Sequence, residues 1–343
     1  MACQCFIIPK DVLDRFAKDL DLTESQRKAF ADAAQFENEW RKVRSLQTRL
    51  SAAARSMLVS GAQAITPPAV TVYNCNHSTT LPGAPVANPG TSSDITAKTA
   101  FVETKAVADF YQTLFARNSV DGAGKTLMSS IHFGVNYNNA FWNGNQMTYG
   151  DGDGKIFVDF TRADDVIGHE LTHGVTQFSS QLAYTNEAGG LNESISDVFG
   201  SMFRQWRAKQ TVDQADWLIG KEIMGPDAIA KGYNCLRDMA NPAAGHCLAP
   251  QPTHFSQYKN GMDPHYSSGI PNLAFYKAAK AIGGNSWDKA GKIWYKALTG
   301  YAPQPNMKMK TFANRTRTLA KSMFPGNPAV LAAVNSAWVA VGL

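Results

Sequence analysis

The segment His169-Glu170-Leu171-Thr172-His173 lies in a stretch whose apolar residues recur at helical spacing. Two histidines four residues apart project from the same face of a helix, so their rings can bind one zinc ion. Glu170 lies beside them and can take a proton from the water at the open zinc position, rather than complete the tetrahedral ligand set. For these five residues alone, the simpler interpretation is a pair of surface histidines on a helix.

A second predicted helix carries Asn192-Glu193-Ser194-Ile195-Ser196-Asp197, and its Glu193 follows His173 by twenty residues. This helix can deliver Glu193 as the third zinc ligand. Asp197 lies four residues later on the same face, where a carboxylate can accept the free ring N–H of a zinc-bound histidine and fix its tautomer. The alternative for the two acidic residues is a solvated helix face.

The composition of the 343-residue chain, 44% hydrophobic and 18% charged, is that of a soluble globular protein with two or three packed units. Its apolar stretches are shorter than the roughly 20 residues of a membrane span, so we expect no membrane anchor. The net charge of +5 is spread along the chain without a block of like charges, which argues against nucleic-acid binding. The first residues lack the pattern of a conventional signal peptide, which predicts cytoplasmic synthesis and, if the protein is secreted, a non-classical route.

The composition changes abruptly along the chain. Residues 10–58 are polar, Ala-rich and almost free of Gly and Pro, which predicts two amphipathic helices. Residues 60–99 are rich in Gly, Pro, Ser, Thr and Asn, which favours loops and short strands and puts a boundary near their start. Short β-type runs are predicted at Met128–Val135 and Ile156–Phe160. Further helices are predicted over residues 101–117, 164–178, 189–207, 271–282, 287–298, 308–323 and 328–341.

Five motifs, in this order along the chain, closely resemble those of the thermolysin-like zinc metallopeptidases. They are Asn138-Asn139-Ala140-Phe141-Trp142, the 169–173 segment, Tyr184-Thr185-Asn186-Glu187, the 192–197 segment and His265-Tyr266-Ser267-Ser268-Gly269-Ile270-Pro271-Asn272. The resemblance covers roughly Thr66 to Leu343 and implies an α+β fold with two lobes. A β-rich lobe over residues 61–165 and a mainly helical lobe over 166–343 then enclose the zinc site. It implies an endopeptidase that acts on peptides or proteins, and we expect a monomer.

The resemblance also implies the groups that stabilise the transition state. Water attack on a peptide carbonyl builds negative charge on oxygen, so donors beyond the metal are needed. In the family pattern Tyr184 donates its O–H and a protonated His265 its N–H, although each alone would be read as a packed aromatic or a surface histidine. Asp263 can hold that imidazole charged, but the family's usual aspartate is spaced differently.

The same resemblance implies how a substrate binds. Asn139 and the backbone of Ala140 would bond the substrate main chain, and Arg237 would bond a substrate carbonyl beside the S1′ pocket. A turn residue and an exposed loop arginine are the alternatives for Asn139 and Arg237. The implied pocket walls are Phe157, Val166 and Leu236, which predicts a preference for Leu, Phe or Ile after the scissile bond.

Two other functions share parts of this pattern. A zinc aminopeptidase also combines two such histidines with a distant glutamate, but it needs an acidic group for the free α-amine, and we find no such motif upstream of His169. A non-catalytic, zinc-stabilised binding protein would be expected to lack Glu170, Tyr184 or His265, and all three are present.

Calcium is not expected at the site where thermolysin-like enzymes commonly use a cluster of carboxylates. Asp165 and Asp216 match two of those ligands, but Arg204 and Lys221 stand where the family has glutamates, and cations cannot ligate calcium. We therefore expect one catalytic zinc ion and predict that the double calcium site is absent, with ion pairs in its place.

Residues 1–60 are predicted to be an inhibitory propeptide, because the resemblance begins only after them. A short precursor region opening with a cysteine and an apolar-Pro stretch resembles the protealysin-like branch of the family, here as Cys5-Phe6-Ile7-Ile8-Pro9-Lys10, which departs from that branch's Pro-Pro-Leu pattern. Cys5, or alternatively Cys3, can bind the zinc as thiolate, or have no zinc contact. Ile7 and Ile8 can fill apolar subsites, and cleavage is expected between Ser51 and Val72.

Two of the five cysteines, Cys235 and Cys247, lie in a loop-like stretch rich in Pro, Gly and Ala. They can pair if the protein reaches an oxidising compartment, and free thiols are equally allowed by the sequence.

Overall fold

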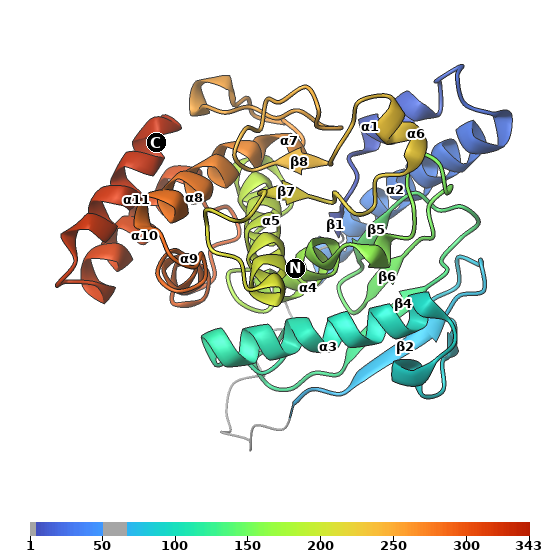
Figure 1. Cartoon of the computed structure of the whole chain (residues 1–343), viewed down its shortest axis with the longest axis horizontal. Coiled ribbons are helices and arrows are strands. Elements are labelled where there is room, and N and C mark those ends of the chain that lie inside the picture. Colours follow the sequence, from blue (N-terminus) through green and yellow to red (C-terminus); the bar gives the residue numbers. More distant parts are fainter. Residues whose placement is uncertain (1–4, 51–66) are drawn as a thin grey trace.

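The computed structural model describes residues 5–50 and 67–343. It has a lobe built on a β-sheet and a lobe built from helices, and the buried helix α4 (Asp164–Gln177) lies between them (Figure 1). The α+β class and the two-lobe arrangement predicted from the sequence are therefore confirmed.

The sheet of the first lobe has six strands in the order β1-β5-β6-β4-β2-β3. The strands are β1 (Cys5–Phe6), β2 (Val70–Asn74), β3 (Ala84–Pro85), β4 (Leu127–Ile131), β5 (Ala140–Trp142) and β6 (Met147–Tyr149). The pairs β2–β4 and β4–β6 are parallel, and the others are antiparallel. The start of the described chain thus forms one edge of the sheet, next to β5, and this strand was not predicted.

Helix α3 (Ile95–Phe115) covers one side of the sheet and begins six residues before its predicted start. Asp94 explains the earlier start, because its side chain accepts the N–H of Ala97 at 3.2 Å and caps the helix.

The ring of His132 lies between two carboxylates, 2.7 Å from Asp151 and 3.0 Å from Asp94. The hydrogen bond to Asp151 outweighs burial and raises the pKa of His132 to about 9.

Helices α4 and α5 (Asn186–Ala208) are packed unusually closely, and both are buried over most of their length. A glycine at position 200 permits this approach, because a Cβ there would stand 2.4 Å from the backbone oxygen of Asp165. Gly168 lies on the α4 side of the same contact. A Cβ atom added to Gly168 would stand 3.0 Å from the Cα of Gly200. Side chains of the two helices therefore meet at short range.

The second lobe contains four helices that agree with the sequence prediction to within a few residues. They are α8 (Gly269–Ile282), α9 (Ala290–Thr299), α10 (Met309–Met323) and α11 (Pro328–Ala340). The short helix α7 (Pro264–Ser267) was not predicted. The two-stranded sheet of β7 (Leu218–Ile219) and β8 (Arg237–Asp238) packs against α5, and the short helix α6 (Pro226–Ala230) lies to the right of it in Figure 1.

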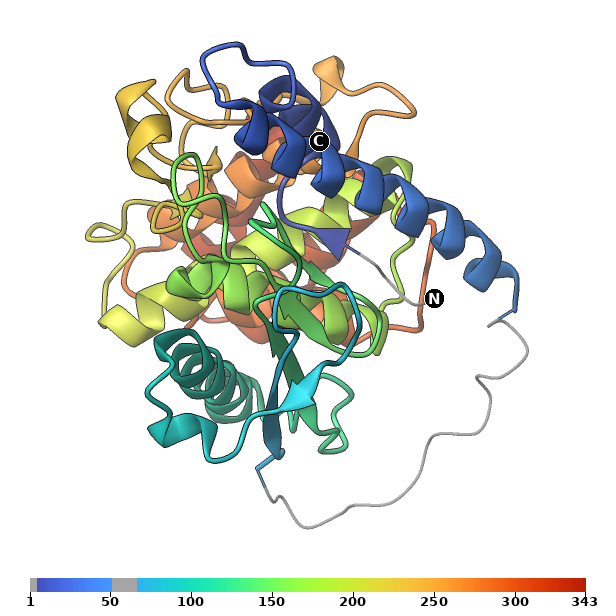
Figure 2. The ribbon, with the colours of Figure 1, turned by 90° about the vertical axis from the view of Figure 1, so that its right-hand side faces the viewer.

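The N-terminal segment forms the two predicted helices, α1 (Lys10–Phe16) and α2 (Glu24–Leu50), which lie across the outside of the two lobes (Figure 2). Phe6, Leu13 and Phe30 are fully buried and belong to the same apolar core as the two lobes. The segment is thus docked through a continuous apolar interface.

One predicted strand, Ile156–Phe160, is wrong. The side chain of Asp153 accepts the backbone N–H groups of Lys155, Ile156 and Phe157 at 2.9 to 3.1 Å, so these donors are satisfied locally and not by a neighbouring strand. Only an isolated bridge at Phe157 remains.

Among the helices in the described part of the chain, none is long and apolar enough to cross a membrane.

Candidate zinc centre and substrate cleft

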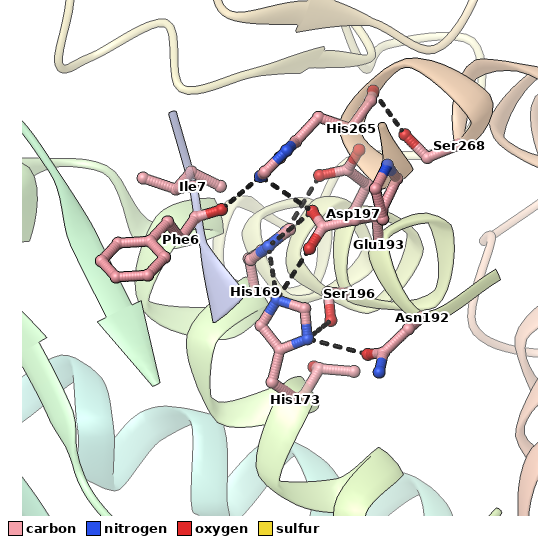
Figure 3. Close-up of polar contacts among 12 residues, drawn as sticks. Phe6, Ile7, His169, His173, Asn192, Glu193, Ser196, Asp197, His265 and Ser268 are labelled. Carbon is pink, nitrogen blue, oxygen red and sulfur yellow. Dashed lines mark hydrogen bonds and ion pairs between the residues drawn. The ribbon is translucent and has the colours of Figure 1, made fainter. Parts of the chain in front are cut away.

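Helix α4 places His169 and His173 one above the other on the face that meets α5. Their Nε2 atoms are 2.9 Å apart, and both side chains are fully buried. The carboxylate of Glu193 comes from α5; its Oε2 lies 3.4 Å from Nε2 of His169, and its Oε1 lies 3.4 Å from Nε2 of His173. The structure therefore brings together the three residues predicted as zinc ligands (Figure 3).

The outward ring nitrogens are held by polar groups of α5. Asp197 lies 2.9 Å from Nδ1 of His169, as predicted, whereas Nδ1 of His173 meets Asn192 at 2.9 Å and Ser196 at 3.0 Å. These contacts direct both Nε2 atoms toward Glu193. Asn192 and Ser196 were not predicted at this site, although their positions, next to Glu193 and about one turn after it, could have indicated them.

The residues at this centre fit a zinc ion. The Oε2 atom of Glu193 is buried and has no hydrogen-bond partner among the described residues, although two ring nitrogens face the same carboxylate. Two imidazole nitrogens and one carboxylate are the donor set of catalytic zinc sites, which keep a further position open. Both oxygens of Glu170 are also buried without a hydrogen-bond partner in the described chain, and burial raises the pKa of this carboxyl to about 8.

Two further predicted groups lie beside the centre. The O–H of Tyr184 donates to Glu193 at 2.5 Å, and the same oxygen is 3.2 Å from Nε2 of His265. Asp263 accepts from Nδ1 of His265 at 2.7 Å. Burial opposes the charged ring, but Glu193 and Asp263 outweigh it and raise the pKa of His265 to about 9. His265 is therefore held as a cation that can donate a hydrogen bond.

The cleft is filled by the beginning of the chain. Strand β1 pairs antiparallel with β5, and the N–H of Ile7 donates to the carbonyl of Ala140 at 3.1 Å. Arg237 donates to the carbonyl of Ile7 at 3.0 Å. Asn139 accepts from the N–H of Ile8 at 3.0 Å and donates to its carbonyl at 3.3 Å. The three residues predicted to bind substrate main chain thus all contact residues 7 and 8.

The side chain of Arg237 also has a second, structural role. It is fully buried and donates two hydrogen bonds to Asp197, at 2.8 and 2.7 Å. Asp197 in addition accepts from Asn272 at 2.8 Å. These contacts connect the cleft to His169 through Asp197, and Asn272 is a member of this network that the sequence analysis did not single out.

The predicted S1′ residues Phe157, Val166 and Leu236 are all buried in the apolar core. The ring of Phe157 packs against Phe30 of α2, with ring centroids 6.2 Å apart. Their role in binding a substrate side chain stays a prediction.

The cysteines differ in state. The sulfur of Cys5 lies within 4.8 Å of ligand atoms of His173 and Glu193, but Cys5 is disulfide-bonded. Cys3 and most of the predicted cleavage region lie outside the described residues. Cys235 and Cys247 are buried free thiols with their sulfurs 3.8 Å apart, so the disulfide allowed by the sequence is not formed in this structure.

The carboxylates that match calcium ligands are bound by a cation of the chain. Arg204 donates to Asp165 at 3.0 Å and to Asp216, and Lys221 lies 3.2 Å from Asp216. The buried Asp165 also accepts the N–H of Gly220 at 3.1 Å.

The two lobes, the facing histidines and the carboxylates from the next helix define a metal-dependent peptidase. The model of the thermolysin metallopeptidase catalytic domain matches residues 37–177, and that of the thermolysin metallopeptidase alpha-helical domain matches residues 180–343. The chain therefore belongs to the thermolysin family of zinc metallopeptidases.

Similar proteins agree with this membership. An extracellular metalloprotease of Pectobacterium carotovorum subsp. carotovorum is 42% identical over 79% of this chain and 80% of its own length. Protease PrtS of a Photorhabdus strain is 38% identical over 79% of this chain and 76% of its own length. The solved precursor of protealysin, a metalloproteinase from Serratia proteamaculans, superposes with a TM-score of 0.82 at 37% identity, covering 98% of this chain and 99% of its own.

Proposed function

We propose that this chain is the latent form of a zinc endopeptidase, and that its first 60 or so residues inhibit it by binding as a substrate would. The observation that carries the proposal is the set of main-chain hydrogen bonds from Ala140, Asn139 and Arg237 to Ile7 and Ile8. Backbone hydrogen bonds to a strand edge recognise an extended chain with little regard to its side chains. A substrate therefore needs the positions that the N-terminal segment occupies.

The direction of the segment supports a specific register. The carbonyl of Phe6 accepts from His265, and the next residue, Ile7, is bonded by Ala140 and Arg237. If a substrate binds in the same way, the bond after the residue equivalent to Phe6 is the scissile bond. The residue equivalent to Ile7 then follows it, which supports a preference for a bulky apolar side chain at that place.

In this register the residues of the centre have separate tasks. His169, His173 and Glu193 would hold the zinc ion, which supplies a Lewis acid and an acidified water when it is bound. Glu170 is the base that takes the proton of the attacking water, because its buried carboxylate follows His169 directly and has a pKa raised to about 8 by burial. The cationic His265 and the O–H of Tyr184 donate hydrogen bonds to the oxygen of the attacked carbonyl as its negative charge grows.

Inhibition in this proposal does not depend on a sulfur ligand. The main chain of residues 6 to 8 already excludes a substrate from the cleft, whereas a zinc contact of Cys5 requires its disulfide to be reduced to a thiolate. The Cys5 contact therefore stays a prediction. We also propose that Arg204 replaces calcium beside Asp165 and Asp216, since a fixed cation already meets both carboxylates.

The proposal is tested with an internally quenched peptide blocked at both ends. The intact chain, verified by mass before and after the assay, is compared with chain shortened by cleavage between Ser51 and Val72, each with and without a chelator. The shortened chain should cleave internal bonds and lose this activity with the chelator, and the intact chain should be nearly inert. Equal rates for intact and shortened chain would contradict the propeptide role, and release of single N-terminal residues from unblocked peptides alone would indicate an aminopeptidase.

The Glu170→Gln variant separates the base from the metal ligands. It should retain the zinc content of the parent and lose turnover, because the carboxylate is assigned to proton transfer. His173→Ala should lose both zinc and activity. Near-parental turnover by Glu170→Gln would remove this residue from the mechanism.

A further inference from the structure

A second group of metal-ligating side chains lies beside the strand that carries Arg237. Cys235 precedes β8, and the chain returns through a loop so that Cys247 forms an isolated parallel bridge with it. The N–H of Asn234 donates to the carbonyl of His246 at 2.9 Å, and the N–H of Leu248 donates to that of Cys235 at 2.9 Å. The backbone therefore holds the two cysteines side by side without a covalent link.

The side chains of this group converge on one point. Both cysteines are fully buried, and one ring nitrogen of His246 lies within 4.8 Å of both sulfurs. The two sulfurs are 3.8 Å apart. A tetrahedral zinc ion with zinc–sulfur bonds of about 2.3 Å sets two thiolates about 3.8 Å apart, whereas a disulfide requires about 2.05 Å. The observed separation, which also allows an S–H···S hydrogen bond between the thiols, is compatible with a shared zinc ion and too long for a disulfide.

A carboxylate orients the histidine. Nε2 of His246 lies 3.2 Å from Oδ2 of Asp238. The other oxygen of Asp238 accepts the N–H groups of Ala240 and Asn241, at 2.8 and 3.0 Å, so the carboxylate is fixed by the loop. Metal-binding histidines are commonly fixed by such a carboxylate partner.

The charge of the group also suits a cation. Two adjacent buried thiolates without a cation between them would repel each other strongly. A divalent ion removes this obstacle by neutralising both thiolates. In the apolar surroundings formed with Ala244 and Leu218, such a neutralised group is favoured over two separate charges.

We propose that Cys235, His246 and Cys247 bind a second, structural zinc ion. Three protein ligands leave one coordination position for water, which can enter on the side where the His246 side chain is 37% exposed. Cys235 lies two residues before Arg237, so the ion fixes the chain segment whose arginine bonds Asp197 and the occupant of the cleft. The site thus supports the cleft without contacting the reacting atoms.

The test counts zinc ions in the full-length chain. Glu170→Gln is used as the background to prevent self-cleavage, and the protein is kept reduced, loaded with zinc and freed of excess metal on a weak chelating resin. We expect two zinc ions per chain, one after Cys235→Ser/Cys247→Ser, and two in the matched control Cys75→Ser, which changes a buried thiol elsewhere. His246→Ala alters a partly exposed side chain and should weaken the second zinc by more than about tenfold.

Cobalt provides a second measurement that does not depend on catalysis. Cys5 is replaced by Ser in every chain of this measurement, because its thiolate lies near His173 and Glu193 and could bind cobalt there. Loading the apo-protein with Co²⁺ should then give a thiolate-to-cobalt charge-transfer band that disappears in Cys235→Ser/Cys247→Ser and persists in Cys75→Ser. Thermal unfolding checks that each variant is folded before its metal is counted. A zinc count that the double substitution leaves unchanged, a cobalt band that survives the double substitution, or a Cys235–Cys247 disulfide in protein kept reduced throughout would overturn the proposal.

Discussion

Phe36 of α2 is the residue through which the proposed inhibition can be weakened without touching the zinc centre. Its half-buried ring packs against Phe6 of β1 and against Phe133, Tyr137 and Phe141 of the catalytic body, with ring centroids 5.2 to 6.5 Å apart. Replacing a fully buried Phe by Ala costs about 3–5 kcal/mol, so for this half-buried ring we expect about 2 kcal/mol. That energy corresponds to an increase of about 30-fold in the ratio of open to closed cleft.

The assay measures the initial rate at which intact Phe36→Ala cleaves the blocked peptide, with the shortened enzyme as the upper limit. We expect about 30 times the rate of the intact parent, unless the upper limit is reached first. Phe115→Ala is the matched control, because Phe115 packs against Phe110, Phe199 and Tyr295, away from the N-terminal segment.

Phe115→Ala should lower stability without raising the rate of the intact chain. A parental rate for intact Phe36→Ala would refute the docking role of α2. An equal rise in both variants would attribute the activity to general loosening of the fold and not to release of the segment.

Three more predictions concern stability, measured by unfolding of the Glu170→Gln chain. His132→Gln should lower the free energy of unfolding by about 2 kcal/mol below pH 6.5, because the raised pKa of His132 means that its charged form stabilises the fold. This loss should shrink as the pH rises toward about 9. A loss that stays constant with pH would show that the charge is not involved. Gly200→Ala should lower the free energy of unfolding by about 3 kcal/mol, because the added Cβ meets the backbone of α4. In the control Gly326→Ala the added Cβ has nothing within 4 Å, so the free energy of unfolding should change by less than about 0.5 kcal/mol. Equal effects of the two substitutions would contradict this explanation. Calcium should leave the thermal midpoint unchanged, because Arg204 already binds the carboxylates; a rise of several degrees would indicate a calcium site.

The sequence was most informative where function depends on local spacing. His169 and His173 meet because a helix sets their separation, and the long amphipathic helices of the second lobe follow the same periodicity. Glu193 required more, since its approach depends on Gly200 and the close packing of α4 and α5. The position of Glu193 beside the two histidines was predicted from the family resemblance, because residue spacing alone does not show how two helices pack.

The missed features depend on contacts between distant residues or on side chains that replace backbone partners. Strand β1 has two residues and exists only because β5, more than 130 positions later, offers an edge. The run Ile156–Phe160 has the composition of a strand, yet Asp153 takes its N–H groups. Asp94 shows the opposite case, because its capping bond to Ala97 extends α3 into a stretch that composition had marked as loop.

The place of β1 at the end of the six-stranded sheet has a consequence for how the protein survives its own synthesis. Without β1, strand β5 would be the edge of the sheet, and an unpaired edge can pair with an extended segment of another chain. While Cys5 and Phe6 pair with β5, its edge is covered. We therefore expect the N-terminal segment to reduce aggregation. A chain produced without this segment should precipitate at protein concentrations at which the full-length chain stays soluble.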